Sequence, residues 1–146
     1  MNIYLASSWR NQAQPGVLHI LRKCGHTVYD FRNPAPDNDG FRWSDIDPNW
    51  KEWDGPAYRE ALNHPVALKG YSYDIEALKA CDACVLLLPA GRSASWEFGY
   101  AMGQGKKGYV IQLETQEPEL MFREATIITS INEVFDAFGE SDDITP

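Results

Sequence analysis

The stretch from Leu86 to Gly105, LLLPAGRSASWEFGYAMGQG, contains the transition that decides the fold. With Val85, its first residues form an apolar run typical of a buried strand, and Pro89–Ser93 is a turn. Ser95 is the candidate N-cap of a helix that begins near it and places Glu97 in its first turn. In a parallel sheet covered by helices, ligands bind where the carboxyl ends of strands meet helix N-termini. We therefore expect a ligand site around Glu97.

Strand and helix patterns alternate along the rest of the chain. The predicted strands, rich in β-branched, aromatic and other apolar residues, are Asn2–Ala6, Thr27–Phe31, Ala83–Leu88, Lys107–Leu113 and Thr126–Thr129. The predicted helices run from Pro15 until Gly25, over Ala57–Asn63 with Pro65 as its stop, over Tyr71–Ala80, from Ser95 to Met102, and over Ser130–Phe138. This order predicts an α/β fold, a flavodoxin-like three-layer sandwich of about five mainly parallel strands in the order 2-1-3-4-5.

The predicted strand order has a switch point between the first and third strands. The loops that follow Ala6 and Leu88 should come together there. Ser7 and Trp9 of the first loop are therefore candidate ligand-binding residues.

Residues 33–56 interrupt the pattern as an insertion rich in Pro, Asp, Asn and Gly that also holds three of the five tryptophans. Long aromatic loops often cover ligand sites, so the insertion could be a lid. Alternatively, its tryptophans pack on the parent domain or on a partner subunit. Residues 139–146 form an acidic tail that is expected to fray.

Composition restricts the possible partners. The 146 residues correspond to about one domain, and we expect a single domain over residues 1–146. There are 21 acidic and 13 basic residues, and the net charge of −8 disfavours binding to nucleic acid polymers or anionic membranes. No apolar run approaches the roughly 20 residues of a membrane-spanning helix, and the N-terminus is more typical of a strand than of a signal peptide. We expect a cytoplasmic protein with a small-molecule partner.

Familiar catalytic motifs are absent from the sequence. It contains no dinucleotide-binding G-x-G-x-x-G after the first strand, no P-loop, no G-x-S-x-G and no H-E-x-x-H. The histidines and cysteines lack zinc-ligand spacing, so neither a metal nor an organic cofactor is predicted. Glu97 has a simple alternative explanation, since acidic residues are favoured in a first helical turn. Asp74 on the preceding helix could be merely solvated, or could reach across to meet Glu97.

Several motifs together resemble the nucleoside 2-deoxyribosyltransferase family, including its nucleoside 5′-monophosphate N-glycosidase relatives. They are IYLA near the N-terminus, Asp74 followed by I-x-x-L-x-x-C-D, VLLLP, S-x-S-W-E-F-G-Y-A and GKKGYVI. The resemblance extends from Asn2 to Ile111, and its most specific part is Glu97–Ala101.

The resemblance implies a role for three residues. Glu97 would attack the anomeric carbon and form a glycosyl-enzyme intermediate, as in retaining glycoside chemistry. Asp74 would contact or protonate the base, and the Tyr4 phenol would donate a hydrogen bond that orients Glu97, unless Tyr4 is simply a core aromatic. The resemblance also implies a homo-oligomer whose active sites borrow residues from a neighbour.

One position departs from the family pattern. The deoxyribosyltransferases usually carry an Asp six residues before the nucleophile, and that position here is Gly91. The same loop offers Arg92, Ser93 and Ser95, a guanidinium and two hydroxyls suited to a phosphate, although they could also be a surface charge and ordinary helix caps. This departure favours the nucleotide hydrolases among the relatives.

We therefore predict an enzyme that cleaves or exchanges the N-glycosidic bond of a nucleoside or nucleoside 5′-monophosphate. Two alternatives are a TIR-like NAD glycohydrolase and a sensor that binds a nucleotide-derived ligand without turnover. The base, ribose against deoxyribose, the phosphate requirement, and transferase against hydrolase activity all stay open at this point.

Overall fold

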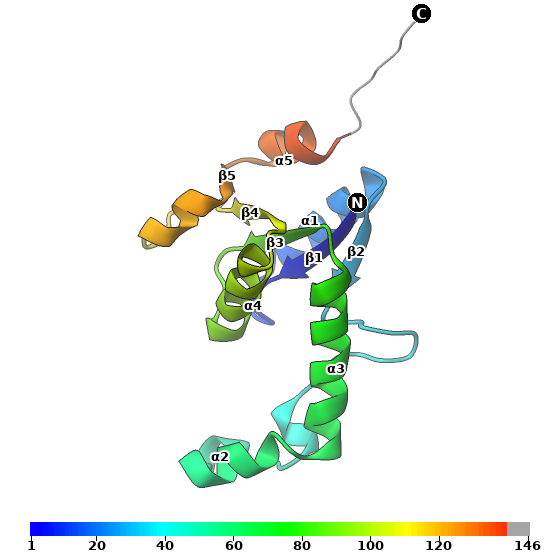
Figure 1. Cartoon of the computed structure of the whole chain (residues 1–146), viewed down its shortest axis with the longest axis vertical. Helices are drawn as coiled ribbons and strands as arrows, with labels where there is room; N and C mark the ends of the chain where they lie inside the picture. The colour runs from blue at the N-terminus through cyan, green and yellow to red at the C-terminus, as the bar shows by residue number, and fades with distance from the viewer. Residues whose placement is uncertain (140–146) are drawn as a thin grey trace, which may run out of the picture.

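The computed structural model, which describes residues 1–139, has a five-stranded parallel sheet between two layers of helices (Figure 1). The strands are β1 (Asn2–Ala6), β2 (Thr27–Asp30), β3 (Ala83–Leu87), β4 (Lys107–Ile111) and β5 (Thr126–Ile128). Their order is β2-β1-β3-β4-β5, with every neighbouring pair parallel. The predicted fold class and strand order are confirmed. Apart from Gly139, the predicted acidic tail lies outside the described residues.

Alternation along the strands divides the core into two faces. The helices are α1 (Gln14–Lys23), α2 (Gly55–Ala61), α3 (Pro65–Ala80), α4 (Arg92–Gly103) and α5 (Ile131–Phe138). Ile3 and Leu5 belong to the core beneath α1 and α5, whereas Tyr4 and Ala6 belong to the core beneath α3 and α4. Successive residues of β1 therefore pack against different helix layers, and Tyr4 faces the layer that contains Glu97. Within residues 1–139 no helix has the length and apolar character that crossing a membrane requires.

Two helices, α3 and α4, begin three or more residues earlier than the sequence predicts. The predicted start of α4 at Ser95 is wrong, because the helix begins at Arg92 with Gly91 as its N-cap. Gly91 supplies no capping side chain, so the usual start signal is absent. Glu97 consequently lies in the second turn of α4, not in the first.

The predicted start of α3 at Tyr71 is also wrong. Pro65 does not only follow α2, as expected of a stop, but opens α3 as its first residue. The His64 side chain caps this helix by accepting a hydrogen bond from the Val66 N–H. Proline suits a first helical turn because its missing N–H has no intrahelical partner there.

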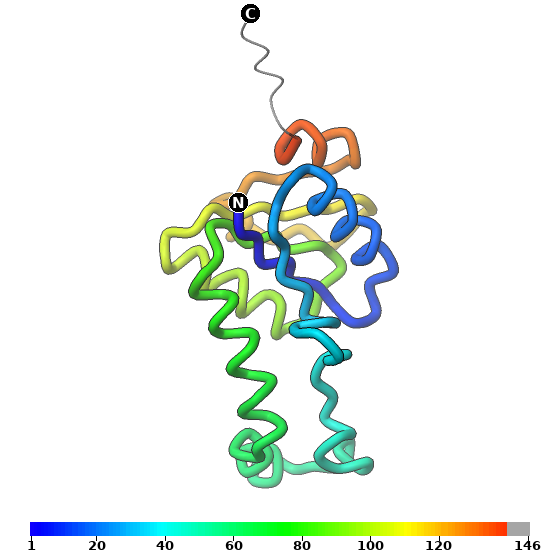
Figure 2. The backbone as a smooth tube through the Cα atoms, turned by 90° about the vertical axis from the view of Figure 1, so that its right-hand side faces the viewer, coloured from blue at the N-terminus to red at the C-terminus, as the bar shows by residue number. Residues whose placement is uncertain are grey.

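Residues 41–62, here called the aromatic arm, project away from the sheet beside the first turns of α3 (Figures 1 and 2). Trp43 packs edge-on against Phe41, Trp53 and Tyr58, with ring centroids 4.7–6.0 Å apart. Phe41 also lies over Gly70 of α3, where an added Cβ would come within 3.1 Å of its side chain. Phe41, Trp43 and Trp53 of the insertion thus form one aromatic cluster, which contacts α3 through Phe41.

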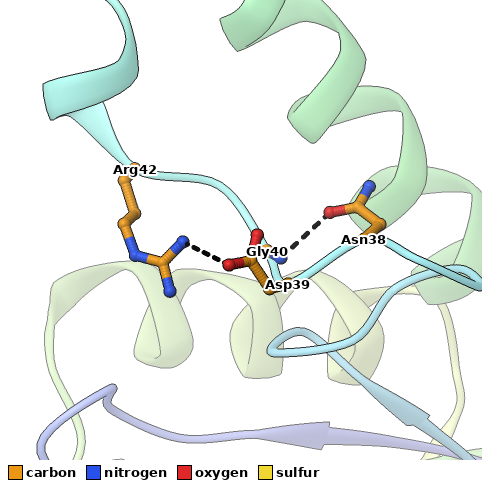
Figure 3. Close-up of polar contacts among 4 residues, drawn as sticks. All are labelled: Asn38, Asp39, Gly40 and Arg42. Atoms are coloured by element: carbon orange, nitrogen blue, oxygen red, sulfur yellow. Dashed lines mark hydrogen bonds and ion pairs between the residues drawn. The ribbon is translucent and has the colours of Figure 1, made fainter.

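A tight turn at residues 38–42 forms the root of the aromatic arm (Figure 3). The Gly40 N–H donates to Asn38 Oδ1 over 2.9 Å, and Arg42 pairs with Asp39 at 3.3 Å. Gly40 has φ +93°, and an added Cβ would lie 2.6 Å from the Trp9 ring. Glycine is required here both by the backbone conformation and by the close approach of Trp9.

Candidate active site

A cavity of about 190 Å³ lies between α3 and α4. Its polar lining consists of Asp74, Ser93 and Glu97, and its apolar lining of Tyr71, Ile75, Leu78 and Trp96. Small-molecule pockets usually enclose about 300–1,000 Å³. A ligand of ordinary size would therefore fill this cavity with one part and extend outward past Tyr71 and Trp96, whose side chains are 59% and 60% exposed.

Glu97 is held in the cavity wall by Tyr4. Tyr4 is completely buried in the middle of β1, and its phenol donates a hydrogen bond to Glu97 Oε2. Burial raises the pKa of Glu97 to about 7, the hydrogen bond from Tyr4 opposes that rise, and the charge of Asp74 adds to it. Burial also raises the pKa of Tyr4, so the phenol keeps its proton and remains a donor.

Asp74 lines the same cavity from α3 and has a tyrosine partner of its own. The Tyr29 phenol, on β2, donates to Asp74 Oδ1 over 2.6 Å. Burial raises the pKa of Asp74, whereas the hydrogen bond from Tyr29 lowers it. Asp74 and Glu97 thus share one cavity, as the sequence suggested they could. Tyr29 was not among the predicted site residues.

The first turn of α4 lies beside the carboxylates. Ser93 lines the cavity, and Arg92 is exposed at the helix start. The first N–H groups of an α-helix have no partner inside the helix, so they are free to bind an anion. Ser95 is less suited to donate, because its hydroxyl already donates to the Gly91 carbonyl over 3.0 Å. Apart from its immediate chain neighbours, no described residue comes within 4 Å of a Cβ built at Gly91.

The loop after β1 meets the loop after β3, as predicted for the switch point. Ser7 Oγ donates to the Leu87 carbonyl over 2.9 Å, and the Asn11 amide donates to the Leu87 and Pro89 carbonyls over 3.4 and 3.2 Å. Asn11 was missed, although an Asn in a polar loop often forms hydrogen bonds with the backbone. Ser7 therefore contacts backbone and does not line the cavity.

Trp9, the other predicted residue of this loop, also lies outside the cavity lining. Its ring packs edge-on against Phe31 with centroids 5.2 Å apart and supports Gly40 at the root of the aromatic arm. Arg32 fixes the same loop, donating to the carbonyls of Ser8, Trp9 and Asn11. Trp9 thus packs the loop after β1 against Phe31 and the root of the aromatic arm.

Two further features bear on alternative sites. Among residues 1–139, no group of three or more His, Cys, Asp or Glu side chains is arranged to hold a metal ion. A second cavity of about 380 Å³ lies near α1 and α5, lined by Lys23, Cys24, Gly25, Phe135 and Gly139. It is larger, yet its described lining lacks a carboxylate, so the candidate site is the cavity that holds Glu97.

Comparison with protein-family models and with curated proteins gives no match. Solved structures do match. A 2-deoxyribosyltransferase from the psychrotolerant bacterium Bacillus psychrosaccharolyticus is similar with a TM-score of 0.64 and 20% identity, over 94% of this chain and 95% of that one. A conserved protein from Enterococcus faecalis V583 is similar with a TM-score of 0.56 and 14% identity, over 92% of this chain and 94% of that one. Likeness at these identities shows a shared fold over nearly the whole chain.

Proposed function

We propose that this chain breaks the N-glycosidic bond of a nucleoside or nucleoside 5′-monophosphate, with Glu97 as the nucleophile. The observation that carries the proposal is the partly buried Glu97 carboxylate in a cavity wall, held by Tyr4 and sharing the cavity with Asp74. Most enzymes that cleave glycosidic bonds use two carboxyl groups in one active site. The shared fold with a 2-deoxyribosyltransferase supports the same chemistry, together with the E-F-G-Y-A motif at Glu97–Ala101.

The first step of the proposed reaction is attack by Glu97. Because Tyr4 holds Oε2, the other oxygen, Oε1, is free to form a bond to the anomeric carbon. The N-glycosidic bond breaks, and its electron pair leaves with the base nitrogen. Asp74, or a water that it holds, supplies the proton that the departing base takes up. The product of this step is a glycosyl ester on Glu97.

The second step releases the sugar from Glu97. A water, or the nitrogen of an acceptor base, attacks the anomeric carbon, and Glu97 leaves as a carboxylate. The proton lost by the attacking group passes to Asp74 or to solvent, which completes the cycle. The choice between water and an acceptor base decides between hydrolysis and transfer.

The start of α4 is the proposed binding site for the 5′ end of the sugar. Ser93 lines the cavity, Arg92 precedes it as the exposed first residue of α4, and the free N–H groups of the first turn add positive potential. A 5′-phosphate at this position would accept charge-assisted hydrogen bonds from Arg92. Ser95 would contribute less, because its hydroxyl and its backbone N–H both donate to the Gly91 carbonyl.

The test is chromatography of free base after incubation with a panel of nucleosides, their 5′-monophosphates and NAD, with and without an acceptor base. We expect base release from at least one nucleoside or monophosphate, and none from Glu97→Ala with an unchanged circular dichroism spectrum. Release that does not depend on an acceptor indicates a hydrolase. Full activity in Glu97→Ala, or release of nicotinamide alone, would contradict the proposal.

A further inference from the structure

Two tyrosine–carboxylate pairs lie side by side beneath the cavity. Tyr4 of β1 and Tyr29 of β2 are direct neighbours in the parallel register, and their rings stack with centroids 5.1 Å apart at 23°. The first phenol donates to Glu97 on α4 and the second to Asp74 on α3. Each pair thus joins one strand to one helix, and the two acidic groups of the site have matching supports.

We infer that Tyr29 is a positioning residue, which holds Asp74 from β2 as Tyr4 holds Glu97 from β1 and so fixes which Asp74 oxygen faces the substrate. This inference rests on the proposed function. Tyr29 occupies Oδ1, and among the hydrogen bonds of residues 1–139 none engages Oδ2. With Oδ1 fixed, Oδ2 is the oxygen left to meet the departing base or a water beside it.

The stacked rings make the support rigid. A carboxylate on a helix can rotate about its side-chain torsions, and a single hydrogen bond from a packed group removes most of that freedom. Tyr29 cannot move toward or away from Asp74 without disturbing Tyr4, which is buried and itself bound to Glu97. The distance between the two acidic groups is thus set by the spacing of adjacent strands.

Tyr29 also affects the charge of Asp74. The titratable groups facing Asp74 are Tyr29 from β2, Tyr4 from β1 and Glu97 from α4. Burial raises the pKa of Asp74, and the phenol of Tyr29 lowers it by donating to the ionised form. Removing the phenol oxygen therefore favours the protonated acid. A tyrosine that served only as packing would not have this effect.

The test variant is Tyr29→Phe, which keeps the ring stacked on Tyr4 and removes only the hydroxyl. Its matched control is Tyr109→Phe on β4, where the ring packs against Phe138 in the opposite core. Two measurements are made on each folded protein: the pH titration of the Asp74 side-chain carboxyl by carbon-detected NMR without ligand, and kcat and KM for base release across pH.

For Tyr29→Phe we expect the midpoint of the Asp74 titration to move to higher pH. We also expect kcat to fall about tenfold with little change in KM, because a well-positioned acid–base group contributes about 10²–10⁴-fold to a rate. The pH–rate limb that belongs to Asp74 should move in the same direction as the titration. Tyr109→Phe should match the wild type in all three readouts.

An unchanged Asp74 midpoint in Tyr29→Phe would overturn the inference. So would a shifted midpoint with an unchanged kcat, since Tyr29 would then have no effect on the reaction. The NMR titration needs no turnover, so absence of base release in the wild type would count against the proposed function while the titration still tests the hold of Tyr29 on Asp74.

Discussion

The two ends of α3 are held in place by different means. At the cavity end, residues Tyr71–Ala80 pack on the sheet through the buried Leu78, and Asp74 is bound to Tyr29 of β2. At the arm end, residues Pro65–Gly70 pack against the aromatic arm, where Phe41 lies over Gly70. A polar pair and a buried leucine fix the cavity end, whereas contact of Phe41 with a glycine fixes the arm end. The comparison indicates that substitutions at one end should change catalytic activity and substitutions at the other end should change the free energy of unfolding.

The largest effect is expected opposite the cavity end of α3, at Glu97. Glu97→Gln keeps the size of the side chain and an acceptor for Tyr4, but removes the nucleophilic charge. We expect base release to fall by about 10⁴-fold or more, since the neutral amide of Gln cannot form the glycosyl ester. Intact-protein mass spectrometry of acid-quenched wild-type enzyme should show the mass of a glycosyl adduct, which should be missing from the variant. An adduct of the same yield on Glu97→Gln would refute the assignment.

The same substitution should show how much the charge of Glu97 lowers the free energy of unfolding. The pKa of Glu97 is about 7 in the folded protein and 4.5 ordinarily, so the folded state holds the proton more tightly. Stability is therefore lost as pH rises from about 4.5 through 7, where folding must bury a charge. At pH 8 we expect Glu97→Gln to be more stable than the wild type by about 1–3 kcal/mol, with the gap closing by pH 4. Denaturant unfolding at both pH values measures it, and a gap independent of pH would disprove the burial argument.

At the start of α4, next to Ser93 of the cavity lining, Arg92 should affect substrate choice more than the rate of the chemical step. Loss of a charge-assisted hydrogen bond costs about 1.5–3 kcal/mol, so Arg92→Ala should raise KM for a 5′-monophosphate by about tenfold or more. KM for the matching nucleoside should stay within about twofold, because it lacks the group that Arg92 binds. Arg59→Ala on α2 is the control. Equal changes for both substrates would argue against a phosphate at the start of α4.

At the arm end of α3, Phe41→Ala should affect stability alone. Removing a fully buried Phe costs about 3–5 kcal/mol, and Phe41 is half-buried, so we expect a loss of about 1–2 kcal/mol in the free energy of unfolding. The value of kcat/KM should be unchanged, since no residue of the arm lines the cavity. A folded Phe41→Ala protein that lost activity would break the comparison and favour the arm as a lid or as part of a neighbouring site.

The smallest effect distinguishes two helical glycines. Gly99 of α4 has open space around a Cβ, so Gly99→Ala should stabilise the protein by about 0.5–1 kcal/mol through helix propensity. Gly70 of α3 faces Phe41, and the new methyl group would need Phe41 to shift. Gly70→Ala should gain less or be destabilising. Equal thermal stabilisation of both variants would mean that the arm packs loosely on α3.

The fold and the two carboxylates could be predicted from the sequence for physical reasons. The β-α-β order predicts right-handed crossovers in a parallel sheet, and 2-1-3-4-5 is the simplest strand order that fits them, with its switch point between the first and third strands. Glu97 follows a buried strand at that point and also lies in the E-F-G-Y-A motif. The contact between Tyr4 and Glu97 was expected from the family resemblance, and the alternation of side chains along β1 explains why it can form.

The remaining features depend on tertiary contacts that local patterns do not carry. The arm end of α3 was missed because Pro65 was interpreted as the stop of the preceding helix, whereas it is the first residue of α3. The start of α4 was missed because Gly91 offers no capping side chain. The contact of Tyr29 with Asp74 could not be predicted, because it forms only when β2 lies beside β1 in register and α3 brings Asp74 to it.

Trp96 should make the intrinsic fluorescence of the protein sensitive to ligand binding in the cavity. It is the only tryptophan among the five in the chain that lines the cavity, and its ring is largely exposed beside Tyr100, with centroids 5.5 Å apart. Indole emission depends on contact with solvent and on stacking with other rings. A ligand entering between Tyr71 and Trp96 should therefore change the intrinsic fluorescence, so affinity can be titrated in an inactive variant without any label.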